Sequence, residues 1–150
     1  PLKSAPARRL AQPIVGVVIL RAGLGLLPGL LRIAPEASIG HIGLYRNEET
    51  LNPVRYYVRL PPGIPRSFVV LLDPMLATGG SAVATVDILK AWGGRRIKFV
   101  GLIGARPGAE LLQQAHPDVP IYLAALDETL NEHGYIVPGL GDAGDRLFGV

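Results

Sequence analysis

The feature that most constrains the fold is a buried-strand pattern that ends at an acid and continues into a turn of small residues and a helix. Val69 to Leu72 are continuously apolar, as expected for a central parallel strand covered on both faces. Asp73 follows at the carboxyl end of this strand, where open α/β sheets bind their ligands. Helical spacing from Ala82 to Trp92 completes a strand, turn and helix, an order typical of α/β folds.

The turn has the properties of a phosphate-binding loop. Residues Thr78 to Ser81 carry no bulky side chain, so their backbone N–H groups lie open to a ligand. Unpaired N–H groups and the positive end of the helix dipole favour an anion at this point. No Lys precedes Ser81 and no Gly opens the loop, so the pattern differs from that of nucleoside triphosphatases. Taken alone, it fits any phosphate-binding turn.

The rest of the chain alternates apolar runs with helical patterns. Residues 1–13 are rich in Pro and Ala and are interpreted as a linker or a truncated arm, and residues 127–150 form a glycine-rich, acidic tail. The alternation from residue 68 onward predicts an α/β fold with a doubly wound, mainly parallel sheet within residues 14–126. The expected strands are 14–20, 38–44, 54–60, 68–72, 97–103 and 121–125, and the expected helices are 26–33, 81–92 and 108–115.

Composition narrows the function classes. The 150 residues are 49% hydrophobic and contain no Cys, so neither disulfides nor thiolate metal sites are available, which fits a cytoplasmic protein. The longest apolar runs are too short to cross a bilayer, so no membrane role is expected. Residues 1–66 hold nine Lys or Arg against three Asp or Glu, but these arginines are dispersed without clustered aromatics. The charge therefore favours a small polyanionic ligand over nucleic acid.

The segment from Asp73 to Ser81 reads DPMLATGGS and resembles the 5-phosphoribosyl 1-diphosphate (PRPP) signature of type I phosphoribosyltransferases. Most of these enzymes carry two adjacent acids here, and the single acid followed by Pro74 resembles the uracil phosphoribosyltransferases. The resemblance implies that Ala77 to Ser81 hold the 5-phosphate and that Asp73 binds the ribose hydroxyls. The implied PRPP contacts in this segment are Asp73, Pro74, Met75, Leu76, Ala77, Thr78, Gly79, Gly80 and Ser81.

Two arginines are implied as ligands of the diphosphate group. Arg21 follows an expected strand and opens a glycine turn, where its guanidinium can donate paired hydrogen bonds to phosphate oxygens. Arg46 lies in a polar loop between two expected strands, a hairpin that could close over a ligand. In the resembled family both positions contact PRPP, which makes Arg21, Arg46 and Asp73 the expected catalytic set. Either arginine alone would be interpreted as an ordinary surface charge.

The tail resembles the base-binding hood of the same family, and residues 127–150 are called the hood below. The resemblance implies uracil contacts at Ile136, Gly141, Asp142 and Ala143, with Asp142 also close to PRPP. Glycine-rich backbone can pair at close range with the two carbonyl groups and the N3–H of uracil. A G-x-G-x-x-G pattern at 139–144 lacks the strand and helix of a dinucleotide site. The alternative for the hood is a solvated acidic tail.

The resemblance covers residues 14–150 and implies a reaction of uracil with PRPP that yields UMP and diphosphate, in pyrimidine salvage. The resemblance implies Mg²⁺ as a cofactor held mainly by PRPP, which is consistent with the missing second acid beside Asp73. The family implies a homo-oligomer, either dimer or tetramer, and some relatives respond to GTP. The alternatives are a phosphoribosyltransferase for another nucleobase and a non-catalytic sensor of PRPP or nucleotides.

Overall fold

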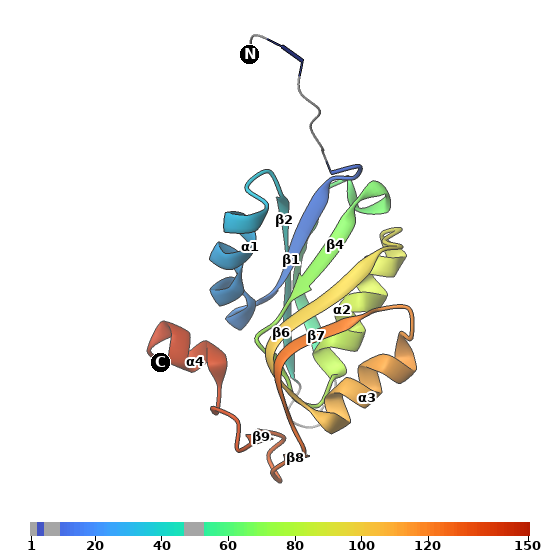
Figure 1. The fold of residues 1–150 in the computed structure, drawn as a ribbon. Coiled ribbons are helices and arrows are strands. Elements are labelled where there is room, and N and C mark those ends of the chain that lie inside the picture. The colour runs from blue at the N-terminus through green and yellow to red at the C-terminus, as the bar shows by residue number, and fades with distance from the viewer. Residues whose placement is uncertain (1–2, 5–9, 47–52) are drawn as a thin grey trace.

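The computed structural model describes residues 3–4, 10–46 and 53–150 (Figure 1). Its strands are β1 (Ile14–Leu20), β2 (Ser38–Arg46), β3 (Pro53–Arg59), β4 (Phe68–Leu72), β5 (Met75–Leu76), β6 (Ile97–Ala105), β7 (Ile121–Asp127), β8 (Thr129–Leu130) and β9 (Ile136–Val137). Its helices are α1 (Leu27–Ile33), α2 (Gly80–Ala91), α3 (Arg106–Ala115) and α4 (Ala143–Phe148), with short 3-10 helices η1 (Ala22–Leu26) and η2 (Ile64–Arg66).

The main sheet has seven strands, in the order β3-β2-β1-β4-β6-β5, with β7 also pairing to β6. All pairs are parallel except β2 with β3, which form an antiparallel hairpin. Helix α1 lies on one side of the sheet, and α2 and α3 lie together on the other (Figure 1). This confirms the expected α/β fold with a doubly wound, mainly parallel sheet.

The larger part of the core lies between the sheet and the helix pair α2 and α3. Alternate residues of the central strands face these helices, as the period of two in a strand requires. Because both strand faces are buried near the centre, the strands are continuously apolar in sequence. The fully buried residues of this cluster include Val17, Leu71, Phe99, Val86, Leu89 and Leu112.

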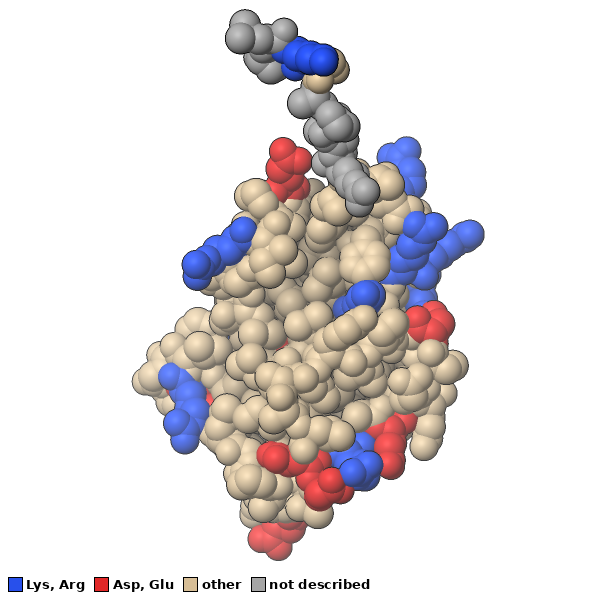
Figure 2. Space-filling view, in the orientation of Figure 1, with Lys and Arg blue, Asp and Glu red and all other residues tan. Residues whose placement is uncertain are grey.

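The opposite face of the sheet is covered unevenly. Helix α1 and η1 pack over β1, where the buried Val18 lies. On β4, β6 and β7 the ammonium group of Lys98 lies 5.4 Å from the ring centroid of Phe68 and 4.8 Å from that of Tyr122, to whose hydroxyl it donates a 3.0 Å hydrogen bond. Charged side chains lie mainly toward the margin of the view in Figure 2, and its middle is largely uncharged.

The core elements agree with the expected ones to within a few residues, and the hood differs. The sequence predicted no regular structure after residue 127, whereas β8 and β9 form a small antiparallel sheet and α4 follows. These elements are two to six residues long, too short for hydrophobic periodicity to reveal. Across the described part of the chain, no helix has both the length and the apolar character needed to span a membrane.

Candidate active site

Two of the expected catalytic residues meet at the carboxyl edge of the parallel sheet. Arg21 follows β1 directly, and Asp73 follows β4. Since β1 and β4 pair in parallel with Val18 opposite Leu72, the two strand ends lie side by side. Between them Gly23 permits close contact, because a Cβ atom there would lie 2.6 Å from the carbonyl oxygen of Leu72. The edge where the sequence places ligands is therefore the edge at which Arg21 and Asp73 both follow their strands.

The phosphate loop, residues 73–81, is attached to the sheet along its first half. The Asp73 N–H donates a 3.2 Å hydrogen bond to the carbonyl of Val100, and the two-residue strand β5 pairs with β6. Gly79 then precedes α2 with φ of 85°, in the left-handed region that favours glycine. The first N–H groups of α2 consequently begin at the end of a fixed loop, which is the arrangement that binds anions at helix N-termini.

Two glycines outside the loop make this conformation possible, and sequence reasoning missed both as site residues. A Cβ atom on Gly108, in the first turn of α3, would collide with the backbone of Ala77. A Cβ atom on Gly101 in β6 would lie 2.8 Å from the carbonyl oxygen of Asp73. Their role depends on contacts with a distant segment, so no local motif identified them.

Asp73 lies in an environment that resists its ionisation. It lines a small cavity of about 90 Å³ together with loop residues. Burial raises the pKa of its carboxyl to about 7, and the nearby charge of Asp142 acts in the same direction. A hydrogen bond from the Met75 backbone opposes this shift. Asp73 is therefore the described acid most sensitive to a cationic or hydroxylic ligand near neutral pH.

The hairpin of β2 and β3 reaches the phosphate loop at its open end. Arg46 is the last residue of β2 and pairs with Pro53 of β3. The Cδ atom of Pro53 lies 4.0 Å from the position that a Cβ atom on Gly80 would take. The backbone of Arg46 is therefore near the loop. The Arg46 side chain and residues 47–52 lie outside the described residues.

The hood begins as a small hairpin and continues as a loop. The Asn131 Oδ1 atom accepts hydrogen bonds from the N–H groups of His133 (3.0 Å) and Tyr135 (2.9 Å), which closes the turn between β8 and β9. After a cis peptide bond at Pro138, the N–H of Gly139 donates a 3.1 Å hydrogen bond to Asp127 Oδ2. These polar contacts fix the hood loop, which has little apolar surface of its own to bury.

The predicted base contacts lie along this loop and the start of α4. Asp142 caps the helix, since its Oδ1 atom accepts a 2.9 Å hydrogen bond from the N–H of Asp145. The side chains of Ile136 and Ala143 are buried, so a ligand would meet mainly backbone groups there. Gly141 has φ of 76°, and no atom lies within 4 Å of the position that a Cβ atom would take, which leaves its surroundings open.

Helix α4 also contacts Arg21. The Nη2 atom of Arg21 donates a 3.0 Å hydrogen bond to Asp145 Oδ1, and its guanidinium lies 5.9 Å from the centroid of the Phe148 ring. A Cβ atom on Gly25 would touch Leu147, which packs α4 against η1. The structure thus brings together Arg21, Asp73, Asp142 and the phosphate loop around one edge of the sheet, although these residues are far apart in sequence.

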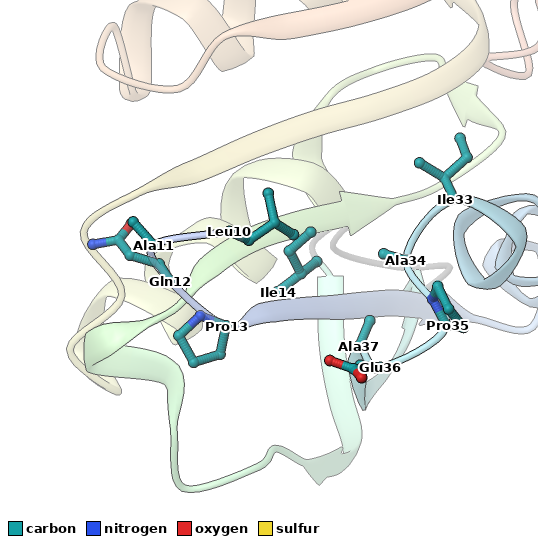
Figure 3. Close-up of a pocket in the computed structure, with 10 residues that line it drawn as sticks. All are labelled: Leu10, Ala11, Gln12, Pro13, Ile14, Ile33, Ala34, Pro35, Glu36 and Ala37. Carbon is teal, nitrogen blue, oxygen red and sulfur yellow. The ribbon is translucent and has the colours of Figure 1, made fainter. Parts of the chain in front are cut away.

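A larger cavity, of about 510 Å³, lies at the opposite edge of the sheet (Figure 3). It is formed by the start of β1, the end of α1 and the segment before β2, with Leu10, Ile14 and Ile33 among its apolar residues. Gln12 and Glu36 are its polar residues, and none of the predicted site residues lines it. Its chemistry gives no reason to move the candidate site away from the phosphate loop.

Comparison with known proteins identifies one family. A family model described as uracil phosphoribosyltransferase matches residues 1–150. The uracil phosphoribosyltransferases of Symbiobacterium thermophilum and Geobacillus kaustophilus are 60% and 57% identical to the chain over its full length. The chain spans 72% of the length of each of these relatives.

Solved structures show the same fold. A protein from Aquifex aeolicus superposes with a TM-score of 0.87 at 45% identity, covering 91% of this chain and 65% of that one. Adenine phosphoribosyltransferase from Trypanosoma brucei, at 21% identity, superposes with a TM-score of 0.65 and covers 89% of this chain and 62% of its own, which shows the fold alone. The family match along the whole chain, with close relatives that the chain covers to 72%, establishes that it belongs to the uracil phosphoribosyltransferase family.

Proposed function

We propose that this chain transfers the phosphoribosyl group of PRPP to N1 of uracil, giving UMP and diphosphate. The observation that carries the proposal is the meeting of Arg21, Asp73 and the phosphate loop at one sheet edge, in a chain 60% identical to a uracil phosphoribosyltransferase. The two alternatives, another nucleobase or a non-catalytic sensor, have no comparable support among the relatives.

The phosphate loop would hold the 5-phosphate of PRPP. Residues Ala77 to Ser81 end at the N-terminus of α2, where backbone N–H groups and the helix dipole favour a phosphate. Because Gly79 and Gly108 keep the loop closed against α3, the N–H groups are in place before the ligand arrives. The loop therefore contributes affinity without a large ordering cost.

Reaction at the anomeric carbon breaks the bond to diphosphate and forms a bond to N1 of uracil, which releases its proton. The sugar is expected to develop oxocarbenium character, so positioning and charge stabilisation carry the rate. Arg21 would bind the departing diphosphate, with Arg46 as its predicted partner from the hairpin. Asp73 would accept hydrogen bonds from the ribose hydroxyls, an interaction that favours its ionised form and opposes the effect of burial.

Mg²⁺ fits the proposal as an ion carried by PRPP. No group of three His, Cys, Asp or Glu converges among the residues that the structure describes, so the carboxylates of Asp73 and Asp142 do not form part of a closed cage. Mg²⁺ commonly binds phosphate oxygens and keeps several waters, with few protein ligands. When bound it would neutralise charge on the diphosphate as that group departs.

The hood would read the base through its backbone. The buried side chains of Ile136 and Ala143 leave peptide groups of the loop to face the ligand, with Gly141 and Asp142 beside them. Uracil presents two acceptors and one donor on its edge, whereas cytosine presents an amino donor in place of the O4 acceptor. A desolvated site built for uracil would reject cytosine by a factor of about 10⁴.

One assay tests the proposal directly. We expect UMP from the protein, uracil, PRPP and Mg²⁺, and comparable kcat/KM for 5-fluorouracil, which keeps the same hydrogen-bonding edge. Cytosine and hypoxanthine serve as the matched comparisons in the same conditions. A higher kcat/KM for hypoxanthine than for uracil would mean that the acceptor is another base. PRPP binding without any product would favour the non-catalytic sensor.

Cytoplasmic localisation, a dimer or tetramer, and activation by GTP remain further predictions of this proposal.

A further inference from the structure

The geometry points to Asp145 as a positioning residue for Arg21, through which the last helix of the hood presets the diphosphate site. This inference rests on the proposed function, since it assigns Arg21 to the diphosphate. Asp145 was not among the residues that sequence reasoning selected. It lies 124 residues from Arg21 in the chain, and their contact joins two segments that the fold brings together.

Helix α4 surrounds the Arg21 guanidinium on more than one side. Asp145 Oδ1 accepts the hydrogen bond from Nη2 at 3.0 Å, and the ring of Phe148 lies against the guanidinium at 5.9 Å. A Cβ atom on Gly144 would lie 3.8 Å from the same Nη2 atom, so the helix backbone also approaches the guanidinium closely. The hydrogen bond to Asp145 uses one of the five N–H donors of the guanidinium, and a ligand can bind to others.

Helix α4 can act as a support because it is itself fixed. Asp142 caps its N-terminus by accepting a hydrogen bond from the backbone N–H of Asp145, which fixes the backbone at that residue. Leu147 packs against Gly25 in η1, the segment that follows Arg21. The support and the residue it supports are therefore attached to the same short helix.

The ion pair is poorly placed to contribute to folding. The Arg21 and Asp145 side chains are 55% and 49% exposed, and exposed pairs of this kind contribute little to stability. Arginine, however, has many rotamers, and ordering them on binding weakens affinity. A carboxylate that holds the guanidinium at the diphosphate side removes part of that ordering cost. We therefore assign the pair to ligand affinity.

The test compares Asp145→Asn and Asp145→Glu with the parent protein. Asp145→Asn removes the charge with little change in volume, and we expect KM for PRPP and the Kd of diphosphate to rise roughly tenfold. The kcat value should change less, because Arg21 remains available once PRPP is bound. Asp145→Glu should recover most of the affinity by restoring the charge. Glu132→Gln, an exposed carboxylate of the hood turn, is the matched control.

A double-mutant cycle separates positioning from a structural role. In the Arg21→Ala background, Asp145→Asn should change KM for PRPP by less than about twofold, because the residue through which it acts is gone. Melting temperatures of all variants are measured alongside. If Asp145→Asn left KM for PRPP and diphosphate binding unchanged, or if its effect persisted without Arg21, Asp145 would have no positioning role.

Tighter PRPP binding by Asp145→Asn would also overturn the inference, since Asp145 would then compete with diphosphate for Arg21. Failure of the proposed function is distinguishable, because the parent protein would then form no UMP from uracil and PRPP, whatever the Asp145 variants do to diphosphate binding. An active parent with Asp145 variants that match it would refute the positioning role alone.

Discussion

The phosphate loop and the hood lie at the same edge of the sheet, but the fold holds them in different ways. The loop is enclosed by backbone: β5 pairs with β6, and Gly79 and Gly108 bring the loop against the start of α3. The hood is held by separate polar contacts, such as Asp127 to Gly139, and by one short helix. Several of its apolar side chains are exposed, namely Tyr135, Val137, Leu147 and Phe148.

The difference separates two kinds of binding surface. A loop fixed by close backbone contacts offers one arrangement of N–H groups, which suits a phosphate that every reaction cycle must bind in the same place. A segment with few buried contacts opens at low free energy, which suits a hood that must admit a base and release a nucleotide. Substitutions in the loop should therefore abolish PRPP binding or leave it unchanged. Substitutions in the hood should lower activity by graded amounts.

Gly79→Ala should have the largest effect, because it tests whether the loop has only one usable conformation. Its φ of 85° disfavours any side chain, and the new Cβ would lie 2.7 Å from the carbonyl oxygen of Gly108. We expect PRPP binding measured by calorimetry to fall below detection while circular dichroism still reports a folded chain. Gly29→Ala, where the added Cβ meets no atom within 4 Å, is the control and should bind PRPP normally.

Arg21→Ala tests the point where the two regions meet. Arg21→Ala removes a guanidinium that faces developing charge, so kcat/KM for PRPP should fall. The expected loss of transition-state stabilisation is roughly 2–4 kcal/mol. Arg46→Ala should act in the same direction, with a larger share in kcat if its hairpin closes over bound ligand. Steady-state kinetics with varied PRPP measure both. Kinetics equal to those of the parent would return each arginine to an ordinary surface charge.

Asp73→Asn tests the electrostatics of the loop through pH. Burial raises the pKa of Asp73 in the folded state to about 7, above its unfolded value of 3.8. At a pH between these two values, the carboxyl is protonated in the folded state and ionised in the unfolded state. Its contribution to stability is therefore present at low pH and is lost as the pH rises through 7. Between pH 6 and 8 this loss should be about 1–2 kcal/mol, and Asp73→Asn should abolish it.

PRPP binding should depend on pH in the opposite sense. The ribose hydroxyls and Mg²⁺ favour the ionised carboxylate, so affinity should increase as the pH rises through about 7. Chemical denaturation and PRPP titration at several pH values measure the two effects on the same protein. A stability profile that is identical for Asp73→Asn and the parent would show that the carboxyl is ionised throughout this range.

The same contrast explains what the sequence could predict. The core strands and helices were predicted closely, because apolar runs such as Val69 to Leu72 and the glycines that follow them are local signals. Arg21 and Asp73 were expected at strand ends because they follow such runs, whereas their roles come from the family resemblance and stay predictions. The structure of the hood was missed, since α4 has six residues and depends on contacts with Arg21 and η1 that leave no periodic pattern.

Glycines whose missing side chain makes room for another segment were not identified from the sequence, for a related reason. Gly101 and Gly108 make room for the backbone of Asp73 and Ala77, which arrive from other parts of the chain. Glycine is common in strands and at helix starts. Its role at these two positions becomes visible only when the backbone that packs against it is known. Sequence reasoning therefore finds groups that bind a ligand more readily than positions that let those groups approach one another.

Asp127→Ala should have the smallest effect of these substitutions, because it removes only one of the separate polar contacts that hold the hood. The N–H of Gly139 loses its 3.1 Å partner, but water can replace it because this hydrogen bond is only part-buried. We expect kcat/KM for uracil to fall about fivefold, near 1 kcal/mol, with KM for PRPP unchanged. Asp127→Asn keeps an oxygen acceptor and should retain most of the activity. A loss of PRPP binding as complete as that of Gly79→Ala would mean that hood and loop form one cooperative unit, and the distinction between a preset loop and an adjustable hood would fail.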